Sequence, residues 1–387
     1  MKGPALAMSS STWNTALFDP KRYFAMYTRK TLPIKSVLLW TRSHVLLFLA
    51  LAFVPVFLYD IIGFKWLHVP WLPLSVVGTA VAFIVGFKNN ASYDRLWEAR
   101  KIWGGIVNAS RSFTVMVKDF VESDEKMPRE PNATHRELVH RHIAWLTALR
   151  YQLRTVRPWE NKRASEENGH FRGMSIRHLE SDVPMDQALA GYISEEESRE
   201  VFGKGNQASQ LLGIQSRRLR ELREQGRLGV FEHVELERTI AELYALQGKS
   251  ERIKNFPYPR QFATLNYIFV WLFILLLPYG VMEEFEKIGD HIIDDHSNAD
   301  DGYGIMHLLW LFFGTHFVWF SIPFSAIVSW VFFALEIAGE HSENPFEGGP
   351  NDVPITDLCR SIEIDIRQLI DDDGIPEKLS WESGVVL

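Results

Sequence analysis

One stretch, residues 71–103, constrains the fold more than any other part of the chain. It begins with an apolar run that suits a lipid bilayer and turns polar at Lys88, within the same helical pattern. Small residues alternate with bulky ones in the apolar part, and small residues let helix backbones approach closely inside a membrane. Thr79, Phe83 and Phe87 recur at four-residue spacing, which predicts that they share one narrow helix face. Such a stripe is typical of a pore wall and equally of a packing face, and spacing alone does not choose between them.

Charged and apolar residues occupy different parts of the chain. Mean hydropathy is -0.08, yet the apolar residues concentrate in a few long runs, while residues 88–260 are dense in charge. This separation is typical of a membrane protein with a large soluble part. The net charge of -7 disfavours a nucleic-acid partner. The single cysteine, Cys359, excludes a disulfide framework and a cysteine-based zinc site, and residues 1–33 lack the apolar core of a cleavable signal peptide.

Four apolar runs are candidates for crossing a bilayer, which takes about 20 helical residues. They are residues 45–62, 72–87, 262–282 and 304–339. The first two predict a helical hairpin, and Lys and Arg residues crowd both of its ends, so the positive-inside rule puts both ends in the cytoplasm. The last run is too long for one straight crossing, and we expect Pro323 to divide it into a kinked helix.

These observations predict an all-α integral membrane protein with four transmembrane regions and a large helical cytosolic domain. We expect it in the plasma (inner) membrane with both termini in the cytoplasm. The expected parts are a cytosolic N-terminal segment (1–42), a transmembrane hairpin (43–88), a cytosolic helical domain (89–260), a third transmembrane helix (261–282), an acidic extracytoplasmic loop (283–303), a kinked fourth transmembrane helix (304–339) and a cytosolic C-terminal segment (340–387).

Residues 86–111, GFKNNASYDRLWEARKIWGGIVNASR, resemble the motif that follows the second transmembrane helix in the bacterial branch of the bestrophin family. Residues 140–154, the Pro257 and Pro259 pair before the third apolar run, and residues 343–366 agree with this resemblance. The resemblance implies an all-helical, homopentameric, bestrophin-like ion channel with one central pore, lined by the second helix of every subunit.

The resemblance also implies positions for the constrictions of such a pore. Thr79, Phe83 and Phe87 match a narrow apolar neck, with Thr79 in place of the family's usual bulky aliphatic residue. Rings of phenylalanine would gate by dewetting, because an ion cannot cheaply pass an apolar collar that excludes water. Phe231 is the candidate for a second, cytosolic aperture.

The expected outer loop carries eight carboxylates and one lysine. The carboxylates are Glu283, Glu284, Glu286, Asp290, Asp294, Asp295, Asp300 and Asp301. A charge run of this kind is often only a solvated surface. Repeated around a pore it would raise the local cation concentration and repel anions. On this basis we expect passive conduction of small monovalent ions, with cations favoured slightly over chloride.

No metal site and no cofactor are expected. Eukaryotic bestrophins hold calcium near an Asn-Pro-Phe sequence that is followed by an acidic run. In this chain only a weak remnant of that calcium motif is present, which begins at Asn344 and ends at Asp352. Calcium prefers six to eight oxygen ligands, so the two carboxylates of this segment, Glu347 and Asp352, are too few to form a site. We expect this segment to form a structural turn on the cytosolic domain.

Two alternative functions are a membrane-embedded, di-iron-like metal enzyme and a secondary transporter. The enzyme would need His140 and His142 to converge with Glu336, Glu340 and His341, although the two histidines point to different helix faces. The transporter would show an inverted repeat, which this sequence lacks. We therefore expect a channel rather than an enzyme. The expected partners of this channel are further copies of itself, the lipid bilayer and small monovalent ions.

Overall fold

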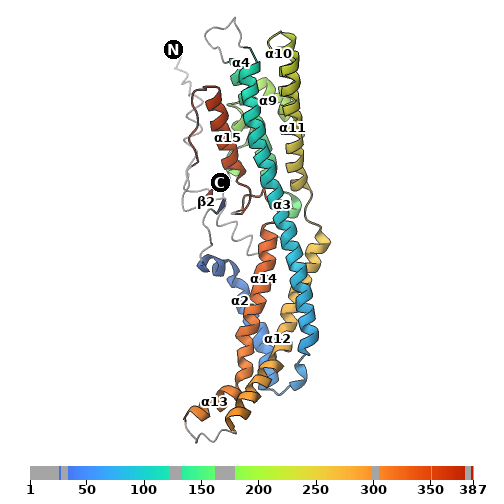
Figure 1. Ribbon diagram of the computed structural model, residues 1–387, viewed down its shortest axis with the longest axis vertical. Coiled ribbons are helices and arrows are strands. Elements are labelled where there is room, and N and C mark those ends of the chain that lie inside the picture. Colours follow the sequence, from blue (N-terminus) through green and yellow to red (C-terminus); the bar gives the residue numbers. More distant parts are fainter. Residues whose placement is uncertain are drawn as a thin grey trace, which may run out of the picture.

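The structure is a computed structural model that describes residues 26–27, 34–122, 133–161, 179–297, 305–349, 351–379 and 385–386. The regular secondary structure of the described part is helical except for a two-residue antiparallel pairing of β1 (Met26–Tyr27) with β2 (Val385–Val386). Two helical regions follow each other along one long axis, and α3 (Trp71–Phe120) runs through both (Figure 1). Its 50 residues correspond to about 75 Å at 1.5 Å per residue.

The first region, called here the apolar bundle, contains the first half of α3 and the other apolar helices. These are α2 (Ile34–Asp60), α12 (Arg260–Ser297), α13 (Ile305–Thr315) and α14 (Ser321–His341), with the short 3-10 helices η2 (Lys65–Leu67) and η3 (Phe317–Phe320). Among the described residues, three helical segments are long and apolar enough to cross a membrane: Lys65–Phe120, Arg260–His296 and Phe317–His341. Two shorter apolar helices are His44–Asp60 and Ile305–Thr315.

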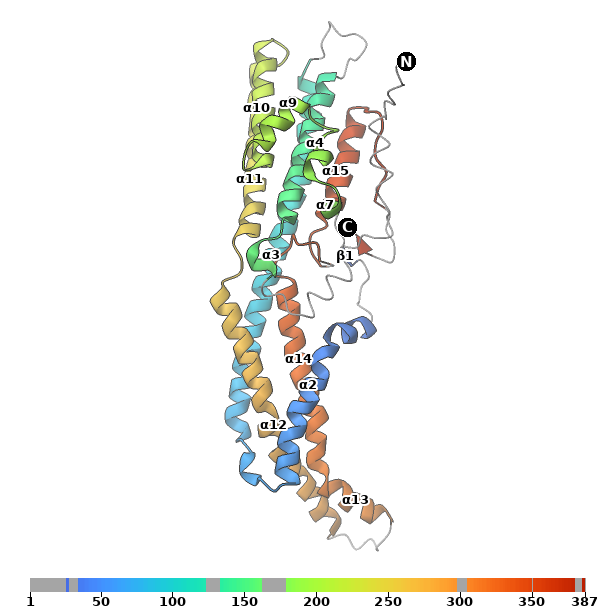
Figure 2. The ribbon, with the colours of Figure 1, turned by 180° about the vertical axis from the view of Figure 1, so that it is seen from behind.

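The second region, called here the polar bundle, contains the second half of α3 and the charged helices. These are α4 (Ala133–Arg154), α10 (Gln207–Glu224), α11 (Val230–Asn255) and α15 (Ile355–Leu369), with the short helices α5 (Pro158–Asn161), α7 (Leu179–Asp182), α8 (Met185–Leu189) and α9 (Glu195–Phe202). Helix α4 lies at its centre and is buried along nearly its whole length. Figure 2 shows the two bundles from behind, joined by α3 and by the chain between α11 and α12.

Glycines bring α3 close to α12 inside the apolar bundle. A Cβ atom added at Gly78 would lie 2.6 Å from Cε2 of Phe273 on α12, and a Cβ at Gly280 would collide with Leu74 on α3. Leu-on-Leu contact gains little over Leu-on-lipid in a membrane, so such close approaches supply much of the packing energy. The small residues of α3 therefore fix which of its faces is turned toward α12.

The contact at Gly78 gives a stability prediction with a control on the same helix. We expect Gly78→Val to lower stability by about 1–3 kcal/mol, because the added methyl groups overpack the rigid ring of Phe273. Gly86→Val is the matched control, since a Cβ at Gly86 meets nothing within 4 Å. Thermal unfolding of both variants in detergent checks this, and an equal loss in the two would contradict it.

A buried histidine connects α4 to α3 in the core of the polar bundle. His142 on α4 is 2% exposed, and its Nε2 atom lies 2.9 Å from Oγ of Ser110 on α3. The Ser110 hydroxyl donates to the carbonyl oxygen of Ile106, so it accepts the proton of the neutral imidazole. Burial lowers the pKa of His142 to about 3 from its ordinary value of 6.5.

This pKa predicts that the fold weakens in mild acid. Below pH 6.5 the unfolded chain binds a proton at His142 that the folded chain does not bind until about pH 3, so stability falls as the pH falls through this window. Between pH 6.5 and pH 5 the loss is about 2 kcal/mol, at 1.36 kcal/mol per pH unit. We expect His142→Phe to reduce the pH dependence of thermal unfolding by that amount. An unchanged slope would contradict the assignment.

Two predicted boundaries are wrong. Residues 283–297 are not a loop, because α12 continues through them to Ser297. Glu283 and Glu284 are spaced four and three residues before Lys287 and pair with it, and such pairs stabilise a helix. Pro323 does not divide the last apolar run either. The break lies earlier, at η3, and Pro323 is the third residue of α14, where its missing N–H removes no helical hydrogen bond.

Local sequence features explain where other helices begin and end. The glycines at 226 and 229 separate α10 from α11, and Gly226 has a φ of 76°, which favours glycine. The described part of the chain between α4 and α10 contains the short helices α5, α7, α8 and α9. Helix α2 begins at Ile34, inside the segment expected to precede the membrane.

Candidate functional site: an exposed stripe on the longest helix

One face of α3 is exposed along its whole length. In the apolar bundle this face carries Thr79, Phe83 and Phe87, and the two phenylalanines are 64% and 70% exposed. The opposite face is buried in the subunit through Leu74, Gly78, Val81 and Val85. The predicted neck residues therefore share one face, as their spacing indicates, and this face does not pack inside its own subunit.

The hydroxyl group of Thr79 does not make this face polar. Its Oγ1 atom donates to the carbonyl oxygen of Ser75 at 2.9 Å, within the helix. A hydroxyl satisfied in this way presents mainly its methyl group to the surroundings. Thr79 thus extends the apolar surface of Phe83 and Phe87 by one turn, with a smaller side chain.

The exposed face becomes polar beyond Phe87 and continues into the polar bundle. The residues that carry it onward are Asn90, Tyr93, Asp94, Trp97, Lys101, Gly104, Asn108, Arg111, Val115 and Asp119, all of which are exposed. Tyr93 and Trp97 stack on each other with ring centroids 6.3 Å apart. A single surface thus changes from apolar to polar along one unbroken helix.

The buried face of α3 holds a lysine at the boundary between the two bundles. Lys88 is 4% exposed and pairs with Glu336 of α14, which is 5% exposed. The other carboxylate oxygen of Glu336 accepts from the side-chain amide of Asn266 on α12. Three helices therefore meet at one charge pair, next to the exposed Phe87 in sequence. A charge buried near bilayer depth is costly without a partner, and Glu336 supplies one to Lys88.

Arg95 and Glu98 tie α3 to the end of α11. Arg95 donates to the carbonyl oxygens of Ile253, Phe256 and Glu343, each at 3.0 Å. The first two lie at the C-terminus of α11, where helical carbonyls lack partners within the helix. Glu98 pairs with Arg252, which also lies near the C-terminus of α11. The partners of both residues come from distant segments rather than from neighbouring turns of α3.

Six of the eight predicted outer carboxylates lie on the last part of α12, and Asp300 and Asp301 lie outside the described residues. Lys287 lies 3.0 Å from carboxylate oxygens of both Glu283 and Glu284. Glu286 pairs with Lys65 of η2 and accepts a hydrogen bond from the Tyr59 hydroxyl. His68 lies 3.7 Å from Glu283. Lys65 and Lys287 thus pair with three of these carboxylates and offset two of their negative charges within the subunit.

Phe231, the candidate for a second aperture, is the second residue of α11. Its side chain is 85% exposed, and the neighbouring Val230 is also exposed. Two adjacent exposed apolar residues at a helix start suit a contact with another molecule or another copy of the chain. The assignment of Phe231 to an aperture stays a prediction.

The weak calcium remnant forms a turn that packs on the polar bundle. Asn344 donates to Glu347 at 2.7 Å, and the backbone N–H of Gly349 donates to Asp352 at 2.6 Å. Phe346, between them, is buried, and its carbonyl oxygen accepts from Arg154 at 2.9 Å. These contacts support the expected role as a structural turn.

The residues of the alternative metal enzyme are held apart. His140 lies 2.8 Å from Asp372, His142 contacts Ser110, and Glu336 pairs with Lys88. In the described part of the chain, no group of three or more His, Cys, Asp or Glu side chains is arranged to hold a metal ion.

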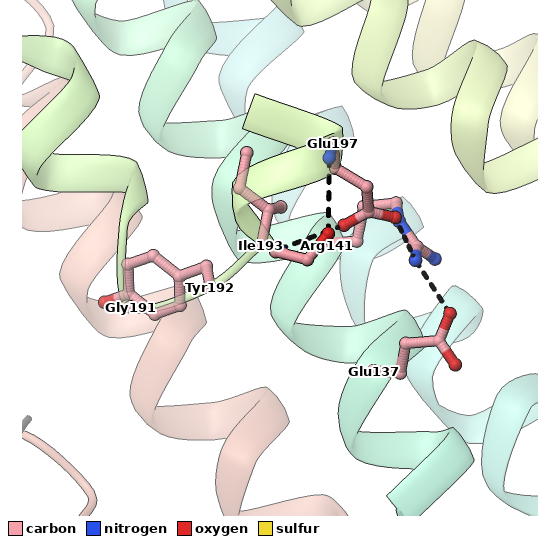
Figure 3. A pocket seen from close by; sticks show the side chains of 7 residues that line it. Glu137, Arg141, Gly191, Tyr192, Ile193 and Glu197 are labelled. Carbon is pink, nitrogen blue, oxygen red and sulfur yellow. Dashed lines mark hydrogen bonds and ion pairs between the residues drawn. The ribbon is translucent and has the colours of Figure 1, made fainter. Parts of the chain in front are cut away.

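A pocket of about 370 Å³ lies in the polar bundle, between α4 and the start of α9. Figure 3 shows Arg141 between two carboxylates of its wall, Glu137 and Glu197, at 2.7 Å and 2.5 Å. Burial alone would raise the pKa of Glu137, but hydrogen bonds from Arg141 and Arg218 bring it below its ordinary value. These ion pairs satisfy the charges of the pocket within the subunit.

Comparison with known proteins identifies relatives that match most of the chain. The family described as Bacterial/Fungal Bestrophin protein matches residues 25–289 and 306–368. The voltage-dependent anion channel-forming protein YneE of Escherichia coli (strain K12) is 27% identical over 308 residues, which cover 79% of each chain. A voltage-dependent anion channel-forming protein of Ralstonia nicotianae is 27% identical over 323 residues, which cover 80% of this chain and 84% of that protein.

Solved structures share the fold. A crystal structure of a bacterial bestrophin homolog from Klebsiella pneumoniae superposes with a TM-score of 0.62 at 20% identity, over 85% of this chain and 98% of that chain. A variant of the same homolog reaches 0.64 at 21% identity, over 87% and 99%. The resemblance inferred from residues 86–111 is thereby confirmed. The chain is a multi-pass membrane protein and belongs to the bacterial/fungal bestrophin family.

Proposed function

We propose that the chain forms a passive channel for small monovalent ions, as a homopentamer in which α3 of every copy faces a central axis. The neck of the pore is the apolar collar of Thr79, Phe83 and Phe87. The observation that carries the proposal is the exposure of Phe83 and Phe87 on a helix whose opposite face is packed. An apolar ring at an axis opposes ion passage until it is wetted or widened.

Lipid alone does not account for the exposed face of α3. From Phe83 to Asp119 the exposed surface extends about 54 Å along the helix, well beyond a bilayer core of about 30 Å. The far part carries Asn90, Asp94 and Lys101, which suit water rather than acyl chains. A water-filled axis shared by several copies explains both halves of the stripe with one arrangement.

The bilayer in this proposal surrounds the apolar bundle. The polar bundle and both termini then lie in the cytoplasm of a plasma (inner) membrane, on the side where lysine and arginine crowd residues 1–42 and residues 88–101. The last part of α12, with Glu283 to Asp295, lies at the opposite, extracytoplasmic end. Lys88 and Glu336, buried against each other, then hold three helices together near the cytoplasmic exit of the neck.

The sign of the permeant ion is where sequence and relatives disagree. The slight cation preference expected from the acidic residues is not supported, because the relatives are named as anion channel-forming proteins. Lys65 and Lys287 also offset part of the acidic charge within the subunit. The proposed permeant class is therefore small monovalent ions of either sign.

The test is a planar-bilayer recording of the purified protein under asymmetric KCl. The proposal expects a current that follows the electrochemical driving force without a second co-substrate, which separates a channel from a secondary transporter. The sign of the reversal potential tells whether potassium or chloride dominates. Absence of current from a correctly assembled oligomer would overturn the proposal.

A further inference from the structure

Helix α13 is too short to cross a membrane and too apolar to face water. It has 11 residues, Ile305–Thr315, with the sequence IMHLLWLFFGT, and contains no Asp, Glu, Lys or Arg. At 1.5 Å per residue it reaches about 16 Å, roughly half of a bilayer core. Its exposed bulky residues are Ile305, Met306, Leu308, Leu309, Trp310, Phe312 and Phe313. An exposed apolar surface of this kind marks a contact with a membrane or with another protein.

The position of α13 separates it from the proposed pore. It lies at the end of the apolar bundle opposite the polar bundle, and it projects to the side of the bundle away from α3 (Figures 1 and 2). When the exposed face of α3 is turned toward a central axis, α13 is turned toward the periphery of the assembly. What surrounds a membrane-spanning assembly at its periphery is lipid.

Helix α13 packs against α12 through its glycine, Gly314. Gly314 lies so close to α12 that an added Cβ would be 2.6 Å from Cγ1 of Ile293, and a Cβ at Gly289 would collide with the Gly314 carbonyl oxygen. His296 of α12 stacks on Trp310 with centroids 4.8 Å apart. Helix pairs in membranes associate through small residues, and the one glycine of α13, Gly314, is in contact with α12. The remaining face is made of large side chains, which favour acyl chains over another helix.

The turn that connects α13 to α14 is also compatible with lipid. The backbone N–H of His316 donates to the carbonyl oxygen of Phe312 at 3.2 Å, and that of Trp319 donates to His316 at 3.1 Å. The Thr315 hydroxyl donates to the carbonyl oxygen of Leu311 at 2.8 Å. Backbone groups at membrane depth must find partners within the protein, and this break in the helix provides them.

We propose that the face of α13 formed by Leu308, Leu309, Phe312 and Phe313 lies in the acyl chains of the extracytoplasmic leaflet and anchors the outer end of α12 there. The other side of that end is acidic and faces water, so the hairpin of α12 and α13 sits across the boundary. Glu286 and Glu283 connect it to Lys65 and His68, which lead directly into α3. The anchor thereby fixes the depth at which the pore helix begins.

A fluorescent probe at single cysteines tests the anchor. We label Leu308→Cys and Phe312→Cys with an environment-sensitive dye in a Cys359→Ala background and reconstitute the full chain in vesicles with and without spin-labelled phosphatidylcholine. Asp290→Cys, exposed on the same end of α12, is the matched control. The anchor predicts that labelled lipid removes more than half of the emission at 308 and 312 while aqueous iodide removes almost none, and that Asp290→Cys behaves in the opposite way.

Two results would overturn the anchor. Quenching of positions 308 and 312 by iodide would place α13 in water, and protection from both quenchers would mean that another copy covers it. The inference rests on the bilayer placement of the proposed function but not on ion conduction. A protein that passes the quenching test and carries no current would contradict the channel and leave the anchor standing.

Discussion

Phe83→Ala is expected to raise the unitary conductance of the reconstituted protein about tenfold, and Phe83→Ala with Phe87→Ala is expected to raise it further. Five phenyl rings would become five methyl groups at one level of the pore, so the collar would widen and hold water. A tenfold change in rate corresponds to a barrier lowered by about 1.4 kcal/mol, a modest share of what an unwetted apolar constriction imposes. Single-channel recording in symmetric KCl measures the change.

Controls separate the neck from a general effect on the fold. Phe53→Ala removes an exposed ring of α2, away from the proposed axis, and is expected to leave the conductance unchanged. Phe83→Tyr keeps the ring and adds a hydroxyl group, so an increase in this variant would point to wetting rather than width. Wild-type conductance in Phe83→Ala, with assembly intact, would refute the neck.

The shared face of Thr79, Phe83 and Phe87 could be predicted from sequence, whereas its exposure could not. Four-residue spacing sets the relative direction of side chains on any helix. Whether that direction points into the subunit depends on which side of α3 carries the close contacts, and these involve Phe273 and Leu74 from two different helices. The continuation of the exposed face past Trp97 into the polar bundle is likewise a property of the packed bundles.

The acidic residues at the end of α12 led to the prediction of a loop, whereas the chain is helical there as far as Ser297. A dense run of Glu and Asp after an apolar segment is typical of a solvated loop, and glutamate is also a good helix former. The i, i+3 and i, i+4 pairs of Lys287 favoured the helix, as did packing of Gly289 against α13. The second factor involves Gly314, in the next helix of the chain, and no local pattern reports it. A proline was similarly a poor guide to the break near η3, since Pro323 fits the first turn of α14.

Partners of buried charges were the least predictable part of the site. Cost alone indicates that Lys88 must be paired, because an isolated charge near bilayer depth is expensive. Its partner, Glu336, is 248 residues away in sequence and lies on a helix that contacts α3 only in the folded bundle. Sequence reasoning had assigned Glu336 to a hypothetical metal site, and its carboxylate is engaged by Lys88 and Asn266 instead.

Glu336→Leu is expected to be the most destabilising of these substitutions. The ammonium group of Lys88 would remain buried among α3, α12 and α14 without its counter-charge, and removing one partner of a buried pair costs about 3–5 kcal/mol. We expect loss of most assembled protein after brief heating, measured by size-exclusion chromatography with intrinsic fluorescence. Arg111→Ala is the matched control, because its ion pair with Asp365 is largely exposed and is worth less than about 1 kcal/mol.

The double variant Lys88→Met with Glu336→Leu decides whether charge pairing or side-chain shape carries the stability. Both replacements roughly preserve volume, so the double variant is expected to recover most of the loss, as apolar substitutes for buried ion pairs often do. Asn266 would then lack an acceptor for its amide, which leaves a deficit of about 1–3 kcal/mol that Asn266→Leu should remove. No recovery in the double variant would mean that the two residues act separately. Since Lys88 follows Phe87 directly, recovery of stability with altered conductance would show that the pair also sets the rotation of α3 toward the axis.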